Sequence, residues 1–250
     1  MIDMHTHVLP NLDDGAKNEQ ETAELLRLEY AQGVRELVLT SHYYGKKRPA
    51  ARFLEERNER AKKIKEFVPE DMKIRLGAEV YLTGINDPNN DTLCTLAIEG
   101  TKCVLVEMPF DNRWSKNLLS KLYGFIAQTG YQPIIAHVER YREIAKNPAL
   151  LNFLVKMGCY VQVNTGAFLE KHTRKLAFLL LKHGLVHCLG TDTHNLTDRA
   201  PDYLQAQEIV KERGLSKEWE RVQTRMRQIL AGETVENACI PIKKVFWWYK

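Results

Sequence analysis

Histidines and acidic residues recur in this chain at positions where several of them could bind metal ions together. The chain opens with Met-Ile-Asp-Met-His-Thr-His, so His5 and His7 end an apolar run. Residues i and i+2 of a strand point to the same face, and two imidazoles placed in this way can bind one ion. The full set of candidate ligands is His5, His7, Asp14, His42, Glu79, Glu107, His137, Asp192 and His194.

The size and composition of this set indicate more than one metal ion. A transition-metal ion takes ~4–6 donors, so the set predicts two or three ions that share bridging carboxylates. Imidazole and carboxylate without thiolate suit Mn, Fe or Zn. Such ions would acidify a bridging water to hydroxide near neutral pH, and this hydroxide is the expected nucleophile. Asp14 could instead belong to a turn, because Asp-Asp-Gly is a turn signal.

Two arginines follow candidate ligands closely. Arg140 comes three residues after His137, and Arg199 comes five residues after His194. The planar guanidinium fits phosphate oxygens and stabilises charge on a transferring phosphoryl group. These residues make hydrolysis of a phosphate ester the leading reaction class. The alternatives are that Arg140 pairs with a glutamate on its own helix and that Arg199 is a solvated residue at a helix start.

The elements that must position these side chains alternate between short β-rich runs and longer amphipathic segments. The predicted strands are Met1–Thr6, Arg35–Ser41, Lys73–Ala78, Lys102–Val106, Pro133–Ala136, Tyr160–Asn164 and Val186–Gly190. The predicted helices are Glu19–Gln32, Arg52–Phe67, Lys116–Thr129, Pro148–Met157, Lys171–His183 and Arg199–Arg213. This alternation predicts a parallel sheet, open or closed. The candidate ligands fall at six of the seven predicted strand ends, and only the strand that ends at Asn164 departs from the pattern.

Composition limits the remaining possibilities. No linker or repeat divides the 250 residues, so we expect a single domain over residues 1–250. No apolar run is long enough to span a bilayer, and the start of the chain does not resemble a signal peptide, so we expect a cytoplasmic protein. The net charge of +4 suits an acidic or phosphorylated ligand without requiring nucleic acid. The five cysteines form no Cys-x-x-Cys pair and are expected to be reduced thiols.

Several motifs together resemble a known superfamily. Met-Ile-Asp-Met-His-Thr-His, Leu-Asp-Asp-Gly, Thr-Ser-His-Tyr, Gly-Ala-Glu-Val-Tyr, Glu-Met-Pro, Ala-His-Val-Glu-Arg-Tyr and Gly-Thr-Asp-Thr-His-Asn resemble the polymerase-and-histidinol-phosphatase (PHP) superfamily. Within it they are similar to the bacterial manganese-dependent protein-tyrosine phosphatases of capsule and exopolysaccharide regulation. The resemblance covers Met1 to about Gly232. It implies a distorted (β/α)7 TIM-like barrel of the PHP type, Mn²⁺ as the metal with Fe or Zn as alternatives, and a tyrosine-phosphorylated bacterial tyrosine kinase as the partner.

The resemblance also assigns the ligands. It implies a first metal at His5, His7, Glu79 and Asp192, a second at Glu79, Glu107 and His137, and a third at Asp14, His42 and His194. Arg140 and Arg199 would hold the phosphate oxygens while the hydroxide attacks phosphorus. The residue that protonates the leaving group is not identified.

Three rival functions remain at this point. One is a small-molecule phosphatase of the same superfamily, acting on a substrate such as histidinol phosphate. A second is a metal-dependent amidohydrolase, although that family usually bridges its metals with a modified lysine. A third is an adaptor without activity that binds a kinase tail.

Four further features are open to two interpretations each. Asn164 and Thr165 could contact substrate at the mouth. The basic, aromatic loop at residues 43–48 either binds an acidic phosphopeptide or is simply solvated, and the same choice applies to Arg113 and Trp114. The aromatic, lysine-rich tail at residues 243–250 either contacts a membrane interface or a partner, or packs against the barrel. Peripheral membrane contact is expected only through the kinase or this tail.

Overall fold

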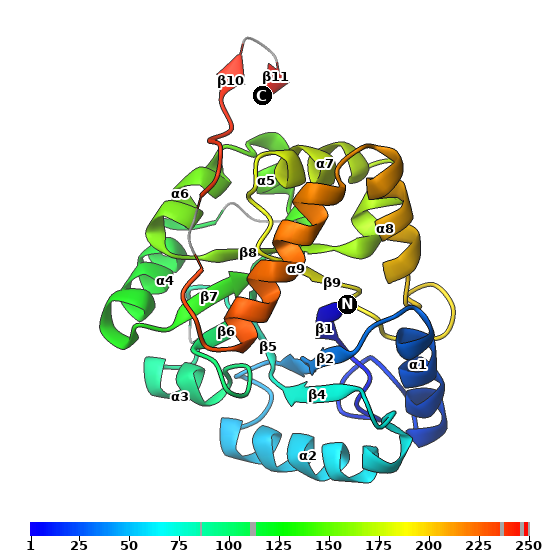
Figure 1. The fold of residues 1–250 in the computed structure, drawn as a ribbon. Helices are drawn as coiled ribbons and strands as arrows, with labels where there is room; N and C mark the ends of the chain where they lie inside the picture. Colours follow the sequence, from blue (N-terminus) through cyan, green and yellow to red (C-terminus); the bar gives the residue numbers. More distant parts are fainter. Residues whose placement is uncertain (86, 111–113, 236–237, 246–247, 250) are drawn as a thin grey trace.

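Parallel strands form the centre of the molecule and helices surround them in the computed structural model (Figure 1). The structure describes residues 1–85, 87–110, 114–235, 238–245 and 248–249. The strands are β1 Ile2–Thr6, β2 Glu36–Leu39, β3 His42–Tyr43, β4 Lys73–Leu76, β5 Glu79–Tyr81, β6 Cys103–Glu107, β7 Gln132–Ile135, β8 Tyr160–Asn164, β9 Cys188–Gly190, β10 Lys244–Val245 and β11 Trp248–Tyr249. The α-helices are α1 Glu19–Ala31, α2 Ala50–Lys63, α3 Asn90–Thr95, α4 Lys116–Thr129, α5 Arg142–Lys146, α6 Leu150–Met157, α7 Arg174–Lys182, α8 Tyr203–Glu212 and α9 Ser216–Leu230. Short 3-10 helices are η1 Lys65–Phe67, η2 Val138–Arg140 and η3 Thr165–Phe168.

The parallel strands form a ring. One sheet has the order β1-β2-β4 and the other the order β3-β5-β6-β7-β8-β9, and all of these pairs are parallel. Backbone hydrogen bonds join the two sheets where β2 leads into β3 and β4 into β5, for example Glu79 N–H to the Thr40 carbonyl at 2.9 Å. The ring closes between β1 and the segment after β9, where Asp192 N–H donates to the His5 carbonyl at 2.8 Å and His7 N–H to the Thr193 carbonyl at 2.9 Å. The fold is the distorted seven-stranded barrel that the sequence predicts.

Two of the predicted strands are broken by bends, which corrects their predicted boundaries. The run at residues 35–41 stops at Leu39, and the run at residues 73–78 stops at Leu76. At the second bend, a Cβ added to Gly77 would lie 3.2 Å from a side-chain atom of Ile98, so the backbone packs closely against that side chain. As a result His42 and Glu79 begin the new strands β3 and β5 instead of ending the earlier ones, and they are direct partners in the register.

The predicted helices are all present, but the last of them begins later than expected, and helices α3, α5 and α9 were not predicted. The predicted helix at residues 199–213 begins only at Tyr203, because Pro201 disfavours helical backbone in the residue before it. Helix α9 was missed, although Trp219, Val222 and Met226 recur at helical spacing and are buried against the barrel.

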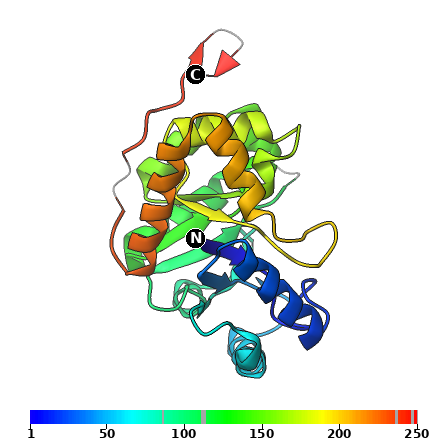
Figure 2. The same ribbon diagram turned by 45° about the vertical axis from the view of Figure 1, so that its right-hand side comes forward.

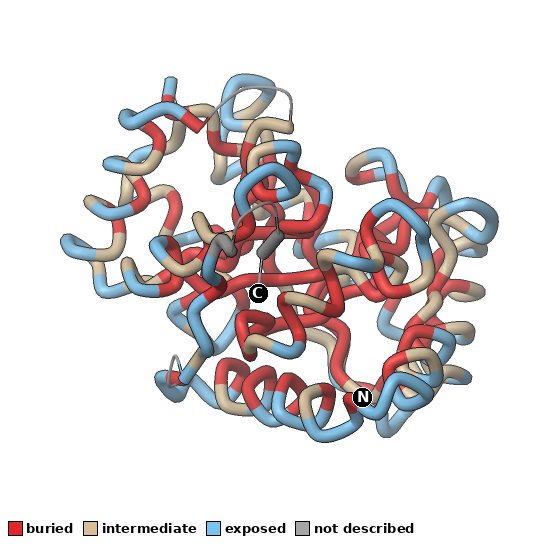
Figure 3. The backbone as a smooth tube through the Cα atoms, turned by 90° about the horizontal axis from the view of Figure 1, so that it is seen from above, coloured by how far each residue is buried: buried red, intermediate tan, exposed pale blue. Residues whose placement is uncertain are grey.

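The core is continuous around the barrel. All five residues of β1 and of β6 are buried, as expected for parallel strands covered on both faces. Figure 3 shows buried backbone through the centre of the molecule and exposed backbone along its outer turns. All five cysteines are free, and Cys103, Cys159 and Cys188 are buried.

The C-terminal segment runs along the outside of the barrel. The side-chain amide of Asn152 in α6 donates to the Ile242 carbonyl at 2.8 Å and accepts from the Ile242 N–H at 3.1 Å. Beyond this point β10 and β11 pair antiparallel and project away from the body (Figures 1 and 2). Phe246, Trp247 and Lys250 lie outside the described residues, so both interpretations of the tail stay open. No helix in the described ranges is both long and apolar enough to cross a bilayer.

Candidate metal centre

The structure brings the predicted ligands together at one rim of the barrel, the rim formed by the carboxyl ends of most strands. Eight of the nine residues are buried, and Asp14 is exposed at the mouth. Strand ends supply His5, Glu107 and the start of the segment that carries Asp192, while the bends supply His42 and Glu79. Convergence of this kind follows from parallel strands that all run toward the same mouth.

Four side chains meet at the centre of the cluster. The Nε2 atoms of His5 and His7 lie 3.0 Å apart. Each of them is also close to Glu79 Oε2, at 3.2 and 3.4 Å, and to Asp192 Oδ1, at 3.4 Å from both. This arrangement contains the four residues that the resemblance implied for the first metal.

Hydrogen bonds from the surrounding protein orient three of the imidazoles. The Nδ1 atom of His5 lies 3.2 Å from Gln162 Oε1, and that of His7 lies 2.8 Å from Asp13 Oδ2. The Nδ1 atom of His194 lies 2.8 Å from the Asp192 carbonyl oxygen. When the rings are neutral, these acceptors take the Nδ1 proton and leave each Nε2 lone pair for a metal ion, as in metal-binding histidines.

Two further groups of ligands lie beside the centre. His42 Nδ1 is 2.9 Å from Glu79 Oε2, while its Nε2 is 3.4 Å from Asp14 Oδ1. Asp14 Oδ1 is also 3.6 Å from His194 Nε2. His137 Nε2 is 2.9 Å from Glu79 Oε1 and 3.7 Å from Glu107 Oε1.

Three sets of these ligand atoms are close enough together to hold an ion each. The sets are His7, Asp14, His42 and His194; His5, His7 and Asp192; and His42, Glu79 and Glu107. They match the implied assignment in outline and differ from it in detail, because His7 and His42 each belong to two sets and His137 contacts the third set only through its two carboxylates.

The donor set fits divalent metal ions on physical grounds. Glu79 Oε2, Asp192 Oδ1, His42 Nδ1 and His194 Nε2 are buried and make no hydrogen bond of normal geometry. A buried polar atom without a partner is costly, and two neutral imidazoles with Nδ1 protonated would place two Nε2 lone pairs 3.0 Å apart, which repel each other. Cations placed among these atoms would remove both penalties.

The electrostatics of the cluster point the same way. Although burial opposes it, the pKa of Asp192 is lowered by His5, His137, His7 and Arg199. Burial would lower the pKa of His7, but Asp13 and Glu79 raise it to about 10. For Glu107, burial and then the Glu79 charge raise the pKa to about 7. Carboxylates packed this closely repel one another unless positive charge lies between them.

Local backbone geometry places two of the ligands. His137 and Asp192 have positive φ angles of 31° and 56°, which are unusual for residues other than glycine and occur most often at functional sites. Gly190 ends β9 beside β1, and a Cβ added there would lie 2.5 Å from His5 Cβ. Only glycine therefore lets β9 approach the strand that carries the first histidines.

Both predicted arginines lie at the edge of the cluster. Arg140 Nη1 is 3.0 Å and Arg199 Nη2 is 2.7 Å from the same oxygen, Asp192 Oδ2. Their side chains are 41% and 35% exposed, so both guanidinium groups can reach a ligand at the mouth. Arg140 therefore pairs with Asp192 and not with a glutamate of its own helix. Arg199 lies before the start of α8 and does not open that helix. A cavity of about 270 Å³ adjoins both arginines.

Three residues near the cluster were missed or left undecided by the sequence. Asp13 accepts from the ring of His7, from His42 N–H at 2.8 Å and from Gly15 N–H at 3.1 Å. Gln162 Oε1 lies 3.2 Å from the His5 ring and accepts from His137 N–H at 2.6 Å, and Asn164 donates to Asp192 Oδ2 at 3.0 Å. The paired aspartates of Asp-Asp-Gly were a signal for Asp13, whereas Gln162 carried none.

Other candidates have structural roles. Trp114 is buried and donates from its ring to the Pro109 carbonyl at 3.2 Å, and Arg113 lies outside the described residues. Thr165 donates to Asp202, a contact between η3 and the start of α8.

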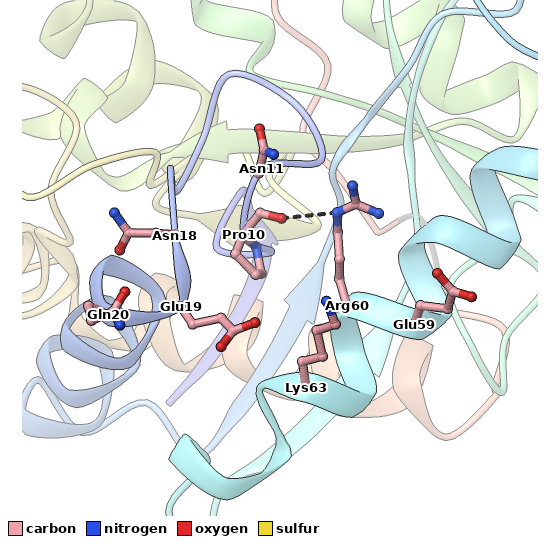
Figure 4. A pocket seen from close by; sticks show the side chains of 8 residues that line it. All are labelled: Pro10, Asn11, Asn18, Glu19, Gln20, Glu59, Arg60 and Lys63. Atoms are coloured by element: carbon pink, nitrogen blue, oxygen red, sulfur yellow. Dashed lines mark hydrogen bonds between the residues drawn. The ribbon is translucent and has the colours of Figure 1, made fainter.

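A separate cavity of about 380 Å³ is lined by residues of the loop after β1, the start of α1 and the end of α2 (Figure 4). None of the candidate ligands lines it. Figure 4 shows Arg60 reaching from α2 toward Pro10, whose carbonyl accepts from Arg60 Nε at 3.0 Å. This contact ties the loop after β1 to α2.

Comparison with known proteins now identifies the family. Residues 1–229 match the model of a family described as capsular polysaccharide synthesis, CpsB/CapC. The chain belongs to the CpsB/CapC family. Among its relatives, tyrosine-protein phosphatase CpsB of Streptococcus pneumoniae is 32% identical over 252 residues, covering 94% of this chain and 100% of the relative. Tyrosine-protein phosphatase YwqE of Bacillus subtilis is 34% identical over 207 residues, covering 80% of this chain and 79% of the relative.

A solved structure of the CpsB/CapC family superimposes closely. It comes from work on YwqE from Bacillus subtilis and CpsB from Streptococcus pneumoniae, described as metal-dependent tyrosine phosphatases. The TM-score is 0.84 at 27% sequence identity, with 98% of this chain and all of the other covered. The predicted superfamily branch and barrel fold are therefore confirmed.

Proposed function

We propose that this CpsB/CapC protein is a metal-dependent protein-tyrosine phosphatase that hydrolyses phosphotyrosine in a protein substrate. The observation that carries the proposal is the convergence of nine metal-type ligands with two arginines that share one carboxylate oxygen. Its relatives named as tyrosine-protein phosphatases support the same reaction. The small-molecule phosphatase, the amidohydrolase and the silent adaptor have no comparable support.

The first task of the chain's residues in this reaction is to hold the metal ions. His5, His7, Glu79 and Asp192 would hold a first ion, Glu107 and His137 with Glu79 a second, and Asp14, His42 and His194 a third. When bound, such ions supply an acidified water and neutralise charge on the phosphate. We propose Mn²⁺ as the metal, because the resemblance implies it and the donors suit it as well as Fe or Zn.

Arg140 and Arg199 would bind the non-bridging phosphate oxygens. Their guanidinium groups converge from η2 and from the loop before α8 on Asp192, so that carboxylate fixes both forks at one edge of the cluster. Because the forks are held before substrate arrives, they can stabilise charge that develops on the phosphoryl oxygens. The leaving tyrosyl oxygen has an ordinary pKa of ~10, so it departs more readily than a serine alkoxide.

We further propose a tyrosine-phosphorylated bacterial tyrosine kinase as the substrate, in the cytoplasm. The description of the family as serving capsular polysaccharide synthesis supports a role in capsule or exopolysaccharide regulation. A substrate of that kind presents phosphotyrosine on an accessible chain segment, which the open mouth near Asp14 and the two arginines can receive.

The test combines metal analysis with substrate comparison. Gently purified protein is analysed for bound metals, stripped with a chelator, and assayed after addition of Mn²⁺, Fe²⁺ or Zn²⁺. We expect hydrolysis of a phosphotyrosine peptide that disappears on stripping and returns best with Mn²⁺. Asp192→Asn should lose it, whereas Asp91→Asn, which removes the same charge from an exposed position on α3 outside the cavities at the metal centre, should keep it. Faster turnover of histidinol phosphate than of the peptide, or full activity without metal, would refute the proposal.

A further inference from the structure

A third cavity, of about 480 Å³, opens beside the candidate metal centre and shares no lining residue with the arginines' cavity. Its lining includes the ligands Asp14 and His42 together with Tyr44, Lys47 and Arg48 from the loop after β3. The cavity therefore borders the candidate metal centre at Asp14 and His42. This loop is the basic, aromatic segment whose role the sequence left open.

A tight turn holds Lys47 at this cavity. Lys47 N–H donates to the Tyr44 carbonyl at 2.8 Å, and the ammonium lies 4.3 Å from the centre of the Tyr44 ring. That ring packs 5.3 Å from the His42 ring and 5.8 Å from the Tyr81 ring. Gly45 closes the turn against Pro88, 3.3 Å from where a Cβ would lie. The Tyr44 ring thus lies between the Lys47 ammonium and the candidate ligand His42.

Most other charges in this cavity already have partners. Asp13 pairs with His7, and Asp14 lies near His42 and His194. Arg48 pairs with Glu56 and donates to the Leu12 carbonyl at 3.0 Å. No carboxylate of the described chain lies within 4 Å of the Lys47 ammonium. Its three N–H donors are consequently available to a ligand.

We propose that this cavity is a substrate subsite in which Lys47, standing on the Tyr44 ring, binds an acidic side chain close to the phosphotyrosine. The inference rests on the proposed function and adds a sequence preference to it. An extended peptide advances about 3.3–3.6 Å per residue, so a glutamate or aspartate within a few residues of the phosphotyrosine can reach the ammonium while the phosphate lies at the metal centre. The aromatic platform restricts the lysine's freedom and so lowers the entropy lost on binding.

Two peptides and two variants test this subsite. One phosphotyrosine peptide carries glutamate at the positions flanking phosphotyrosine on both sides, and the other carries the isosteric glutamine. The variants are Lys47→Gln and, as the matched control, Lys46→Gln, which removes the same charge from an exposed neighbour that does not line the cavity. The protein loaded with Mn²⁺ is used throughout, and p-nitrophenyl phosphate serves as a substrate without flanking residues.

We expect the wild-type protein to have a kcat/KM about three- to fivefold higher for the glutamate peptide at low salt, as an exposed charge pair allows. Lys47→Gln should abolish most of this preference and Lys46→Gln should retain it. Neither change should alter turnover of p-nitrophenyl phosphate. High salt should weaken the preference, since it screens exposed charges.

Three results would overturn the subsite. They are equal kcat/KM values for the two peptides with the wild-type protein, equal losses of preference in both lysine variants, and an equal loss of p-nitrophenyl phosphate turnover in Lys47→Gln. If the wild-type protein loaded with metal hydrolyses neither peptide nor p-nitrophenyl phosphate, the proposed function itself fails. If the enzyme is active but does not prefer glutamate beside phosphotyrosine, only the subsite proposal is refuted.

Discussion

We predict that Asp13 supports metal binding by orienting candidate ligands, although it is not itself in any of the ligand sets. Its Oδ2 accepts from the His7 ring at 2.8 Å and from His42 N–H at 2.8 Å, and its Oδ1 accepts from Gly15 N–H at 3.1 Å. One carboxylate thus fixes two candidate ligands and the turn that carries Asp14. The perturbation that isolates this role is Asp13→Asn.

The size of the expected effect follows from the hydrogen bonds that asparagine cannot make at this position. Asparagine has one acceptor oxygen and one donor amide, so in either orientation its NH₂ group faces an N–H donor. The change also removes the negative charge beside His7. Burial raises the pKa of Asp13, but His7 and His42 lower it to about 2, so the carboxylate is ionised at neutral pH. Losing a charge-assisted bond and leaving a buried donor unsatisfied costs about 1.5–3 kcal/mol. Loss of such a partner typically weakens metal binding by about 10- to 100-fold.

The assay is a Mn²⁺ titration of stripped protein, monitored by the stabilisation of the protein against thermal unfolding. Asp198→Asn is the control, because it removes one carboxylate from an exposed position at the same mouth. Circular dichroism establishes that both variants are folded. If Asp13→Asn binds Mn²⁺ as tightly as the control does, the hydrogen bonds of Asp13 do not orient the ligands and the reasoning is refuted.

Three other predictions concern the mouth, the packing of the barrel and a buried carboxyl. Arg140→Ala and Arg199→Ala should each keep the bound metal and lose about 10²–10³ in kcat on a phosphotyrosine peptide, as loss of a transition-state donor does; unchanged turnover in both would remove their proposed role. Gly190→Ala places a Cβ 2.5 Å from a side-chain atom of β1 and should lower the free energy of unfolding, measured in urea, by about 1–3 kcal/mol. Gly124→Ala, in α4 with open space around it, should raise the free energy of unfolding by about 0.5–1 kcal/mol. Equal effects of the two changes would contradict the packing argument. Burial raises the pKa of Asp202 to about 6, so ionisation of this carboxyl destabilises the folded state as the pH rises from the ordinary pKa of an aspartate through 6. Asp202→Asn should therefore stabilise the metal-free protein by about 2 kcal/mol at pH 7.5, and this gain should shrink toward pH 4.5. A gain independent of pH would show that another group is responsible.

The sequence predicted the architecture well where patterns are local. Strand β8 and helix α4 match their predicted ranges, because alternation and amphipathic spacing depend only on neighbouring residues. The bends after Leu39 and Leu76 were not predicted, and the residues packed around Gly77 at the second bend, Ile98 and Thr40, are distant from it in the chain. Helix α9 was overlooked although its apolar spacing is present, so that omission was a failure of reading and not of information.

The candidate site shows the same division. Its ligand types were visible because histidine and acid at strand ends are unusual and parallel strands share one mouth. The partners Asp13 and Gln162 were not visible, because a hydrogen bond to a ring nitrogen across the barrel leaves no periodic trace in the chain. Likewise, the sequence left Arg140 and Arg199 with local alternatives that only their common contact with Asp192 removed.

By itself, the sequence indicated the class of fold, the residues with metal-binding chemistry and the two arginines proposed to bind phosphate, because these depend on residue type and short-range order. Only the tertiary structure decided which nitrogen of each histidine faces the centre, which carboxylate both arginines share and which lysine stands free beside the mouth. The physical reason is that these features are set by contacts of a few ångströms between segments far apart in the chain, and closure of the barrel alone brings those segments together.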